Sequence, residues 1–335
     1  MASRQLGSAG GSAESHAWQK IDFLTDGKTE GNKVAKTKTP FLSLGSRGTV
    51  GGVLTSQKRG GDTLLRKTPV PTDPYSLAQA YQRWDYKDYA YQWTLLSNAE
   101  KQVYRTTGSR YHITGFSQFM REKLKTLPDL ALRLRLDEKA GIVAYDTSKH
   151  ATNGTIFGAT PTDGLIAGGQ FFTLNDYISV TAPQCDFTSE DFSITLNMRV
   201  DDLTIHRMIL TRGEYTTEGW TSYVASNGQL IFTTTQTAAA QTSRTAIGFI
   251  QTGIDYNIGV SRTGASVRLY AGGIDVTSIV GNHLDPKSCV QPLLVGIYQN
   301  LHNYPFDGML DNLVIYSRHL DATEHYRASQ RRYPA

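Results

Sequence analysis

The sequence predicts a mainly β protein, with an antiparallel jelly-roll sandwich preceded by a small helical module and an extended N-terminal arm. About eleven segments between residues 129 and 335 are rich in β-branched and aromatic residues and are separated by turn signals such as Asn227-Gly228. No helical pattern lies between them, which favours antiparallel pairing over crossover connections. Residues 72–128 instead repeat apolar residues at helical spacing, and residues 1–71 show neither period.

The predicted strands share short alternating or apolar runs bounded by turn residues. They are Leu130 to Leu136, Gly154 to Phe157, Tyr177 to Val180, Phe192 to Val200, Met208 to Thr211, Thr221 to Ala225, Gln229 to Thr234, Tyr256 to Arg262, Ser266 to Ala271, Leu293 to Ile297 and Met309 to Tyr316. In the last strand Leu310, Leu313 and Ile315 are expected to fill the space between two sheets. Asp321 and Glu324 then form a capping box that predicts a short final helix.

Residues 72–128 are predicted to form three short helices. Thr72-Asp73-Pro74 offers a cap followed by proline at the first helical position. Ser97 to Glu100 is a capping box for the second helix, and Thr114-Gly115 opens the third. Leu127-Pro128 ends the module. The many tyrosines and tryptophans of this segment are explained by packing of the three helices against one another.

The arm, residues 1–71, is rich in Gly, Ser, Thr and Lys and cannot bury enough apolar surface to offset its ordering entropy. It is therefore expected to be flexible unless it is bound to a partner. Residues 1–128 hold roughly 19 Lys and Arg against roughly 10 Asp and Glu, although the net charge of the chain is only +4. The residues expected to bind a partner are Phe41, Leu44, Val50, Val53, Leu54, Lys58 and Arg59.

Composition and motifs exclude several classes of protein. Hydrophobic residues make up 39% and charged residues 19% of the chain, and no apolar run approaches the roughly 20 residues that span a bilayer. The first residues lack the apolar segment of a secretory signal, so assembly in a cytoplasm is expected. Cys185 and Cys289 are expected to be separate buried thiols rather than a bridge. Patterns typical of zinc peptidases and nucleotide hydrolases do not occur.

The segment from residue 129 resembles a laminin-G-like domain of the concanavalin A-like lectin/glucanase superfamily. The resemblance rests on Leu136-Asp137-Glu138, Asp146-Thr147-Ser148, Asn153-Gly154-Thr155, Asp176-Tyr177-Ile178 and FDGMLDNLVIYSRHLDATE at Phe306 to Glu324. It implies a concanavalin A-like β-sandwich over residues 129–335, in which the closing strand lies beside the first.

Fold does not fix function, because this superfamily contains lectins, glycosidases, adhesion modules and structural domains. A retaining glucanase on this fold would carry Glu-x-Asp-x-x-Glu, and that pattern is not found. Asp137 and Glu138 are adjacent and are expected to face opposite sides of a strand. No enzymatic activity is therefore expected. Residues suited to stacking a sugar and binding its hydroxyls are Trp220, Tyr298, His302 and Tyr304.

Two alternatives remain open at this point. Trp220 can instead pack between the sheets, with the loop tyrosines covering an edge, and this alternative is favoured. No cofactor is required by the pattern, but calcium is compatible with it, because superfamily members often bind calcium through acidic loops; Asp146, Asp163 and Asp176 are the candidate ligands.

The helical segment WTLLSNAEKQVYRTTGSRYHITGFSQFMREKL, together with the preceding arm, resembles segments of tailed-phage and other viral structural proteins. This implies a virion protein, assembled in a host cytoplasm, whose arm and helices attach to other virion proteins and to copies of itself. The sandwich would be displayed for binding a host-surface glycan. The alternatives are a stand-alone lectin, a glycoside hydrolase, and DNA binding by the basic arm; no membrane partner is expected.

Overall fold

The computed structural model describes residues 35–37, 48–50, 54–59, 62–67, 76–299 and 303–332. The chain divides into two units, residues 1–74 and residues 75–335. In the first unit four short strands form an antiparallel sheet of order β1-β4-β3-β2. These strands are β1 (Ala35–Thr37), β2 (Gly48–Val50), β3 (Leu54–Arg59) and β4 (Asp62–Lys67).

This small sheet adds regular structure to a segment for which the sequence predicted an extended arm that is flexible unless bound to a partner. Of the predicted partner-binding residues, Val50 lies in β2, and Leu54, Lys58 and Arg59 lie in β3. Phe41, Leu44 and Val53 lie outside the described residues. Attachment of this unit to a partner stays a prediction.

The second unit begins with three helices, α1 (Leu77–Leu95), α2 (Asn98–Ser109) and α3 (Gly115–Thr126). Ser97 forms the predicted capping box with Glu100, and the Thr114 hydroxyl caps α3. The first helix begins later than predicted, because Ser76 and Gln79 form its capping box and the predicted cap at residues 72–74 lies outside the described residues. Leu127 adopts a left-handed conformation (φ 41°) that ends α3.

The C-terminal half of α1 packs against the other two helices. Trp93 lies 5.8 Å from Phe116 and 5.4 Å from Phe119 between ring centroids, and Tyr104 lies 5.1 Å from Phe119. These edge-to-face and tilted contacts are the favourable geometries for aromatic pairs. The aromatic residues of the first half of α1 contact the sandwich instead, which the sequence analysis did not anticipate.

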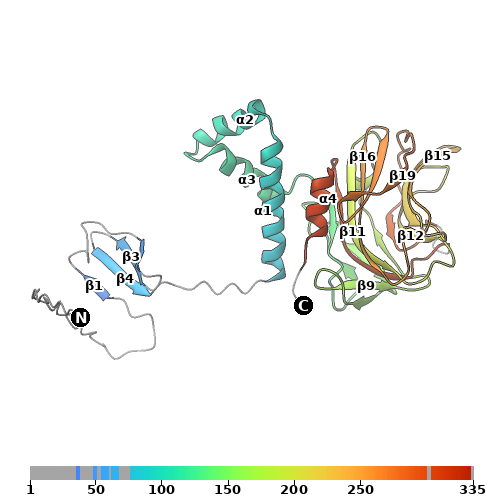
Figure 1. The fold of residues 1–335 in the computed structure, drawn as a ribbon, viewed down its shortest axis with the longest axis horizontal. Helices are drawn as coiled ribbons and strands as arrows, with labels where there is room; N and C mark the ends of the chain where they lie inside the picture. The colour runs from blue at the N-terminus through green and yellow to red at the C-terminus, as the bar shows by residue number, and fades with distance from the viewer. Residues whose placement is uncertain are drawn as a thin grey trace, which may run out of the picture. The chain divides into compact units, whose positions relative to one another are not determined.

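Two antiparallel sheets follow and pack face to face as a sandwich (Figure 1). The nine-stranded sheet contains β19 (Thr277–Ile279), β15 (Ala239–Thr245), β14 (Leu230–Gln236), β13 (Trp220–Val224), β12 (Arg207–Arg212), β20 (Leu293–Val295), β10 (Tyr177–Val180), β7 (Gly154–Phe157) and β6 (Val143–Ala144), in this order. The eight-stranded sheet contains β18 (Ile274–Asp275), β17 (Ser266–Ala271), β16 (Asp255–Thr263), β11 (Phe192–Val200), β21 (Gly308–Tyr316), β9 (Gly169–Phe172) and β8 (Thr160–Thr162), with β5 (Leu130–Leu134) also paired to β21. The predicted antiparallel sandwich is confirmed.

The closing strand β21 lies beside the first strand β5, as the resemblance implied. Leu310, Leu313 and Ile315 are all fully buried in the core between the sheets. Strict alternation would place Leu310 and Leu313 on opposite faces, but the register shifts here and Asn312 has a positive φ of 50°. This bulge turns Asn312 outward, where its side-chain oxygen accepts a hydrogen bond from Tyr81 of α1 (2.9 Å).

Helices α1 and α4 (Ala322–Ser329) cover part of the outer face of the eight-stranded sheet (Figure 1). Asp321 and Glu324 form the predicted capping box of α4. Its His325 is buried, and its Nε2 lies 2.7 Å from the Ser261 hydroxyl of β16. Burial lowers the pKa of His325 to about 3, so the imidazole is neutral at physiological pH.

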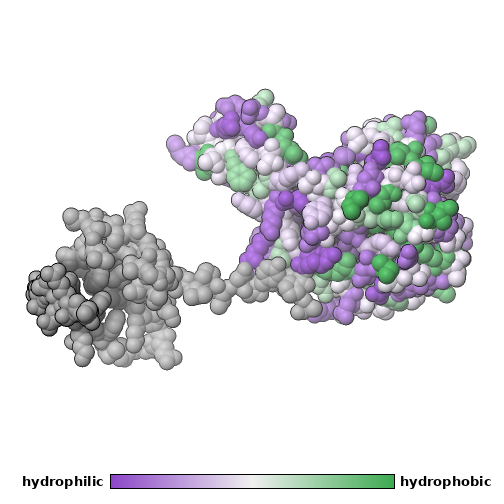
Figure 2. Space-filling model, in the orientation of Figure 1, coloured by the Kyte–Doolittle hydropathy of each residue, from purple (hydrophilic) through white to green (hydrophobic). Residues whose placement is uncertain are grey.

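Ion pairs attach α1 to the sandwich and to α4. Asp85 pairs with Arg133 of β5 (2.8 Å), and Asp88 pairs with Arg331 (2.5 Å) and Arg327 (3.3 Å). Arg133 and Arg331 are each only 4% exposed. The side of α1 that faces away from the sandwich is mainly hydrophilic (Figure 2). The first helix and the sandwich therefore belong to one structural unit, residues 75–335, which includes the predicted boundary at residue 128.

Two further findings concern the cysteines and the possibility of a membrane-spanning helix. Cys185 and Cys289 are buried free thiols, which confirms the expectation of two separate cysteines. Among the described residues, no helix combines the length and apolar character needed to cross a membrane.

Removing the Asp88 carboxylate should leave Arg331 buried without its partner. We expect Asp88→Asn to lower the free energy of unfolding by about 3 kcal/mol, because an uncompensated buried charge is costly. Urea unfolding followed by far-UV circular dichroism measures the change. The matched control is Asp275→Asn, which breaks an exposed pair with Arg268 (3.4 Å) and should cost less than about 1 kcal/mol. Equal losses in the two variants would contradict the structural role of Asp88.

A second prediction concerns Asp311 of β21, which is fully buried. Its Oδ2 accepts hydrogen bonds from the Ile166 backbone (2.9 Å) and the Asn197 side chain (3.1 Å), but burial raises the pKa of its carboxyl to about 7. A raised pKa in the folded state means that the ionised carboxyl destabilises the fold at high pH, and that this penalty fades as the pH falls through 7.

Asp311→Asn keeps an acceptor oxygen and removes the charge. We therefore expect it to raise the free energy of unfolding by about 4 kcal/mol at pH 8 and by roughly 2 kcal/mol at pH 5. Urea titrations at both pH values test this. A variant that is less stable than the wild type at pH 8, or a gain that does not depend on pH, would show that Asp311 is not held as a destabilised carboxylate.

Candidate functional site

A cluster of aromatic side chains lies at the outer side of the nine-stranded sheet, around β12, β13 and β20. We call it the aromatic surface and define it by Tyr215, Tyr223, Tyr298, Tyr304 and His206. Tyr223 faces outward because its neighbours in β13, Ser222 and Val224, are almost fully buried on the opposite side of the strand. Tyr215 and Tyr304 are the most exposed members, at 54% and 42%.

The members contact one another in a continuous chain. Ring centroids of Tyr298 and Tyr304 lie 6.3 Å apart in an edge-to-face arrangement, and Tyr304 lies 5.5 Å from His206. His206 lies 5.7 Å from Tyr223. The Tyr215 backbone N–H donates to the Tyr298 hydroxyl at 2.8 Å, which joins the remaining loop to the cluster.

Backbone conformation fixes the loop that carries Tyr215. Gly213 and Gly219 flank it with φ values of 91° and 79°, and a Cβ at Gly219 would lie only 1.8 Å from the Arg212 carbonyl oxygen. Both positions therefore need glycine. Between them the Glu214 carbonyl accepts hydrogen bonds from the N–H groups of Thr217 and Glu218, each at 3.0 Å. The loop is a closed turn rather than a loose connection.

The second loop is fixed at Tyr304. This residue has a φ of 55°, which is uncommon and costly for a non-glycine residue. Its carbonyl accepts from the Met208 N–H at 2.9 Å, which ties it to β12. His206 Nδ1 in turn accepts from the Ser226 N–H at 3.0 Å, so the imidazole ring is oriented by the backbone. Backbone strain at an exposed aromatic residue is typical of a functional position.

Burial favours the neutral phenols of Tyr298 and Tyr223. Burial raises the pKa of Tyr298, with a further increase from the nearby Glu214 carboxylate. Burial also raises the pKa of Tyr223, close to Tyr215, Arg244 and Tyr304. Neutral phenols donate and accept hydrogen bonds, while Glu214 and Arg244 add an acceptor and a donor nearby. The aromatic surface can therefore stack a ring and hydrogen-bond its polar substituents, and it holds no evident nucleophile.

The comparisons with known proteins concern the sandwich. Residues 172–324 match the family model described as the concanavalin A-like lectin/glucanases superfamily. The sandwich is a concanavalin A-like domain. A comparison with curated protein sequences found no match.

Several solved structures share the fold of this concanavalin A-like domain. The binding domain of Paraclostridial Mosquitocidal Protein 1 is 18% identical, with a TM-score of 0.50 over 60% of this chain and 52% of that chain. A mutant of HCR/D is 14% identical, with a TM-score of 0.51 over 62% and 53%. Domain 4 of AbnA, a GH43 extracellular arabinanase from Geobacillus stearothermophilus in complex with arabinotriose, is 17% identical, with a TM-score of 0.49 over 60% and 98%. The chain spans about half the length of the first two structures, and the likeness to these two shows the fold alone.

Of the residues predicted to bind sugar, the structure brings Tyr298 and Tyr304 together in the concanavalin A-like domain. His302 lies outside the described residues. Tyr215, Tyr223 and His206 were missed, because they lie far from the Tyr298 loop in sequence. A weak signal existed for Tyr215 alone, which sits in a turn-like segment between two glycines.

Trp220 is placed in the core of the concanavalin A-like domain, which corrects its assignment as an exposed sugar platform. It is 1% exposed and stacks with Phe187, Phe192 and Phe232 at centroid distances of 6.0–6.4 Å. Its indole N–H donates to the Cys185 carbonyl at 3.2 Å. The ring thus has no free face for a ligand. Alternate residues of β13 point toward the other sheet, and Trp220 is one of them, so it is buried in the core.

The three candidate calcium ligands do not meet in the described part of the chain, where no group of three His, Cys, Asp or Glu side chains could hold a metal ion. Asp146 is buried and accepts from the N–H groups of Arg133, Ser148 and Thr152 at 2.8–3.0 Å, so it organises a turn. Asp176 accepts from Thr173 in another turn (2.9 Å). Asp163 lines a cavity of about 700 Å³.

Asp137 and Glu138 line that same acidic cavity, although adjacent residues of a strand would face opposite sides. The physical reason is Leu136, whose φ of 61° turns the chain out of the extended conformation before the two carboxylates. Burial raises the pKa of Glu138, and its Oε1 accepts from the Tyr145 N–H at 2.8 Å. One of its two oxygens is thereby committed to the backbone of the concanavalin A-like domain.

Proposed function

We propose that this protein is a non-enzymatic carbohydrate-binding protein and that the aromatic surface of its concanavalin A-like domain is the binding site. The observation that supports the proposal is the convergence of exposed Tyr215 and Tyr304 with Tyr298 and His206 on one outer surface. Aromatic faces pack against the apolar C–H face of a sugar ring, and phenol, imidazole and carboxylate groups bind its hydroxyls.

The geometry favours binding over chemistry. The groups on the aromatic surface are held by backbone hydrogen bonds, and Tyr304 is fixed in a strained conformation, so a ligand meets a preformed surface. A single shallow site of this kind binds weakly. Copies presented together would gain avidity without new contacts, since each later binding event becomes intramolecular. Binding domains among the solved structures of this fold are compatible with the proposal.

Replacing Tyr304 with alanine should abolish the stacking face. We expect Tyr304→Ala and Tyr215→Ala each to weaken binding of the preferred oligosaccharide at least about tenfold, which corresponds to roughly 1.4 kcal/mol. A glycan array of the full-length protein identifies that oligosaccharide, and isothermal titration calorimetry measures the affinities. Tyr326→Ala is the matched control, because Tyr326 is 53% exposed on α4, away from this surface.

Three results would overturn the assignment. Unchanged affinity in both aromatic variants would remove the site, and an equal loss in Tyr326→Ala would indicate nonspecific stacking. Cleavage of the oligosaccharide, abolished in Glu138→Gln, would place the function in the acidic cavity and make the protein a glycoside hydrolase.

We further propose, on the resemblance of the helical segment and the arm, that the protein is a virion structural protein and that residues 1–74 attach it to the particle. Support comes from the division of the chain, in which residues 1–74 form a unit distinct from residues 75–335. The ion pairs of Asp85 and Asp88 place α1 with the sandwich, so the attachment unit in this proposal is shorter than the sequence indicated.

Deleting residues 1–74 should therefore abolish assembly and leave the sandwich folded. We expect residues 75–335 to be a protease-resistant monomer by light scattering, and the full-length chain to self-associate or to co-sediment with virion proteins. A fragment of residues 129–335 serves as the contrasting case and should be unstable, because it leaves Arg133 and Arg331 without their carboxylates on α1. Identical monomers for full-length protein and residues 75–335, with no co-sedimentation, would refute the attachment role.

A further inference from the structure

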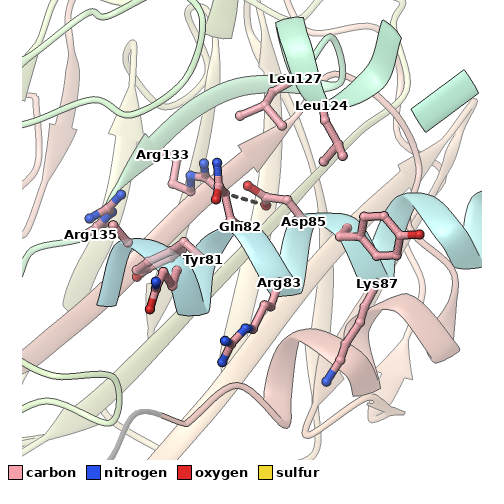
Figure 3. Close-up of a pocket in the computed structure, with 12 residues that line it drawn as sticks. Tyr81, Gln82, Arg83, Asp85, Lys87, Leu124, Leu127, Arg133 and Arg135 are labelled. Atoms are coloured by element: carbon pink, nitrogen blue, oxygen red, sulfur yellow. Dashed lines mark hydrogen bonds and ion pairs between the residues drawn. The ribbon is translucent and has the colours of Figure 1, made fainter. Parts of the chain in front are cut away.

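A second cavity lies between α1, α3 and β5, the first strand of the sandwich, which belongs to the eight-stranded sheet. It has a volume of about 630 Å³. Its lining comes from α1, from α3 and Leu127 after it, and from β5 and Arg135 after it (Figure 3). That volume is within the range of small-molecule sites. We call it the basic cavity. Its lining residues that bear on the argument are Tyr81, Tyr86, Leu124, Leu127, Arg133 and Arg135.

The charge of the basic cavity is strongly unbalanced. Arg83, Lys87, Arg133 and Arg135 line it, against Asp85 as the one carboxylate among its lining residues. Asp85 is already paired with Arg133 (2.8 Å), whose Nε also donates to the Thr147 hydroxyl (2.9 Å). Arg83 and Lys87 extend from α1 away from Leu124 and form an outer basic rim (Figure 3). A concave surface lined by one sign of charge concentrates anions.

Arg135 is a buried-side cation of the cavity that has no counter-ion among residues 76–299 and 303–332. It follows β5 two residues after Arg133, and both side chains reach the same cavity. Its guanidinium lies over the Tyr81 ring at 4.3 Å, and its Nε is buried without a hydrogen-bond partner. Its guanidinium makes no ion pair within residues 76–299 and 303–332. A guanidinium has five donors in a planar fork that fits carboxylate and phosphate groups.

The opposite wall of the basic cavity is apolar. Leu124 of α3 and Leu127, which follows that helix, lie above α1 (Figure 3), and Tyr86, which is 47% exposed, also lines the cavity. Tyr86 is held edge-to-face against Phe116 at 6.5 Å, so it forms a fixed part of the wall. A ligand that matches both walls carries an anionic group at one end and a flat apolar body at the other.

We propose that the basic cavity binds a small organic anion, with its carboxylate or phosphate group on the Arg135 guanidinium and its apolar body against Tyr86, Leu124 and Leu127. The site is separate from the aromatic surface, because β5 belongs to the eight-stranded sheet and β12, β13 and β20 belong to the nine-stranded sheet. Carboxylate and phosphate share the chemistry that Arg135 recognises, and the choice of probes distinguishes them.

Calorimetric titration of the full-length protein tests the proposal with four probes: benzoate, phenyl phosphate, inorganic phosphate and benzyl alcohol. We expect one of the two aromatic anions to bind with one-to-one stoichiometry, and inorganic phosphate and benzyl alcohol to bind at least tenfold more weakly. Arg135→Gln should weaken the aromatic anion at least tenfold. Arg135→Lys, which keeps the charge but not the planar fork, should be intermediate.

Two controls separate this site from general electrostatics and from glycan binding. Arg268→Gln removes an exposed arginine of β17 and should leave the affinity unchanged. Tyr304→Ala should also leave it unchanged, whatever that variant does to oligosaccharide binding. Equal affinity in Arg135→Gln and the wild type, an equal loss in Arg268→Gln, or the absence of saturable binding by either aromatic anion in the millimolar range would overturn the proposal. Circular dichroism of each variant confirms that it is folded.

Discussion

The structure of residues 75–335 depends on the pairing of buried arginines with carboxylates on one helix. Arg133 and Arg331 are nearly inaccessible to water, and a buried guanidinium is tolerated only when it is paired and hydrogen-bonded. Their partners are Asp85 and Asp88, one turn apart on α1. The helix therefore cannot leave the sandwich without exposing or stranding two charges. This constraint, rather than apolar packing alone, makes the helices part of the same unit as the concanavalin A-like domain.

The same constraint determines where ligands can reach the domain. α1 and α4 cover part of the outer face of the eight-stranded sheet, and buried pairs such as Ser261 and His325 fill the space beneath α4. The basic cavity lies beside α1 on that side and exists because the helix is held at this position. The outer face of the nine-stranded sheet carries no helix among the described residues, so the loops of Tyr215 and Tyr304 are free to present aromatic rings.

Much of the fold could be predicted because its signals are local. Capping boxes at Ser97 and Asp321 lie within four residues, and the alternation of β11 or β17 is read within one segment. β15 was missed because Ala239–Thr245 is half-buried and lacks the apolar alternation of a strand that covers a core. The docking of α1 was missed for another reason. Asp88 and Arg331 are 243 residues apart, and no local pattern marks two charges as partners.

The binding surfaces could be predicted less well than the fold, because their residues come together from distant parts of the sequence. Tyr298 and Tyr304 could be proposed together because one loop carries both, but Tyr215 joins them through a hydrogen bond across 83 residues. The sequence offered both Trp220 and Tyr304 as sugar-binding residues. Trp220 lies in β13 and is buried in the core, whereas Tyr304 lies in a loop and its ring is exposed. Arg135 carried no signal at all, because what distinguishes it is a missing partner. Residue type indicates which groups can bind a ligand, whereas their pairing in the fold decides which of them are left to do so.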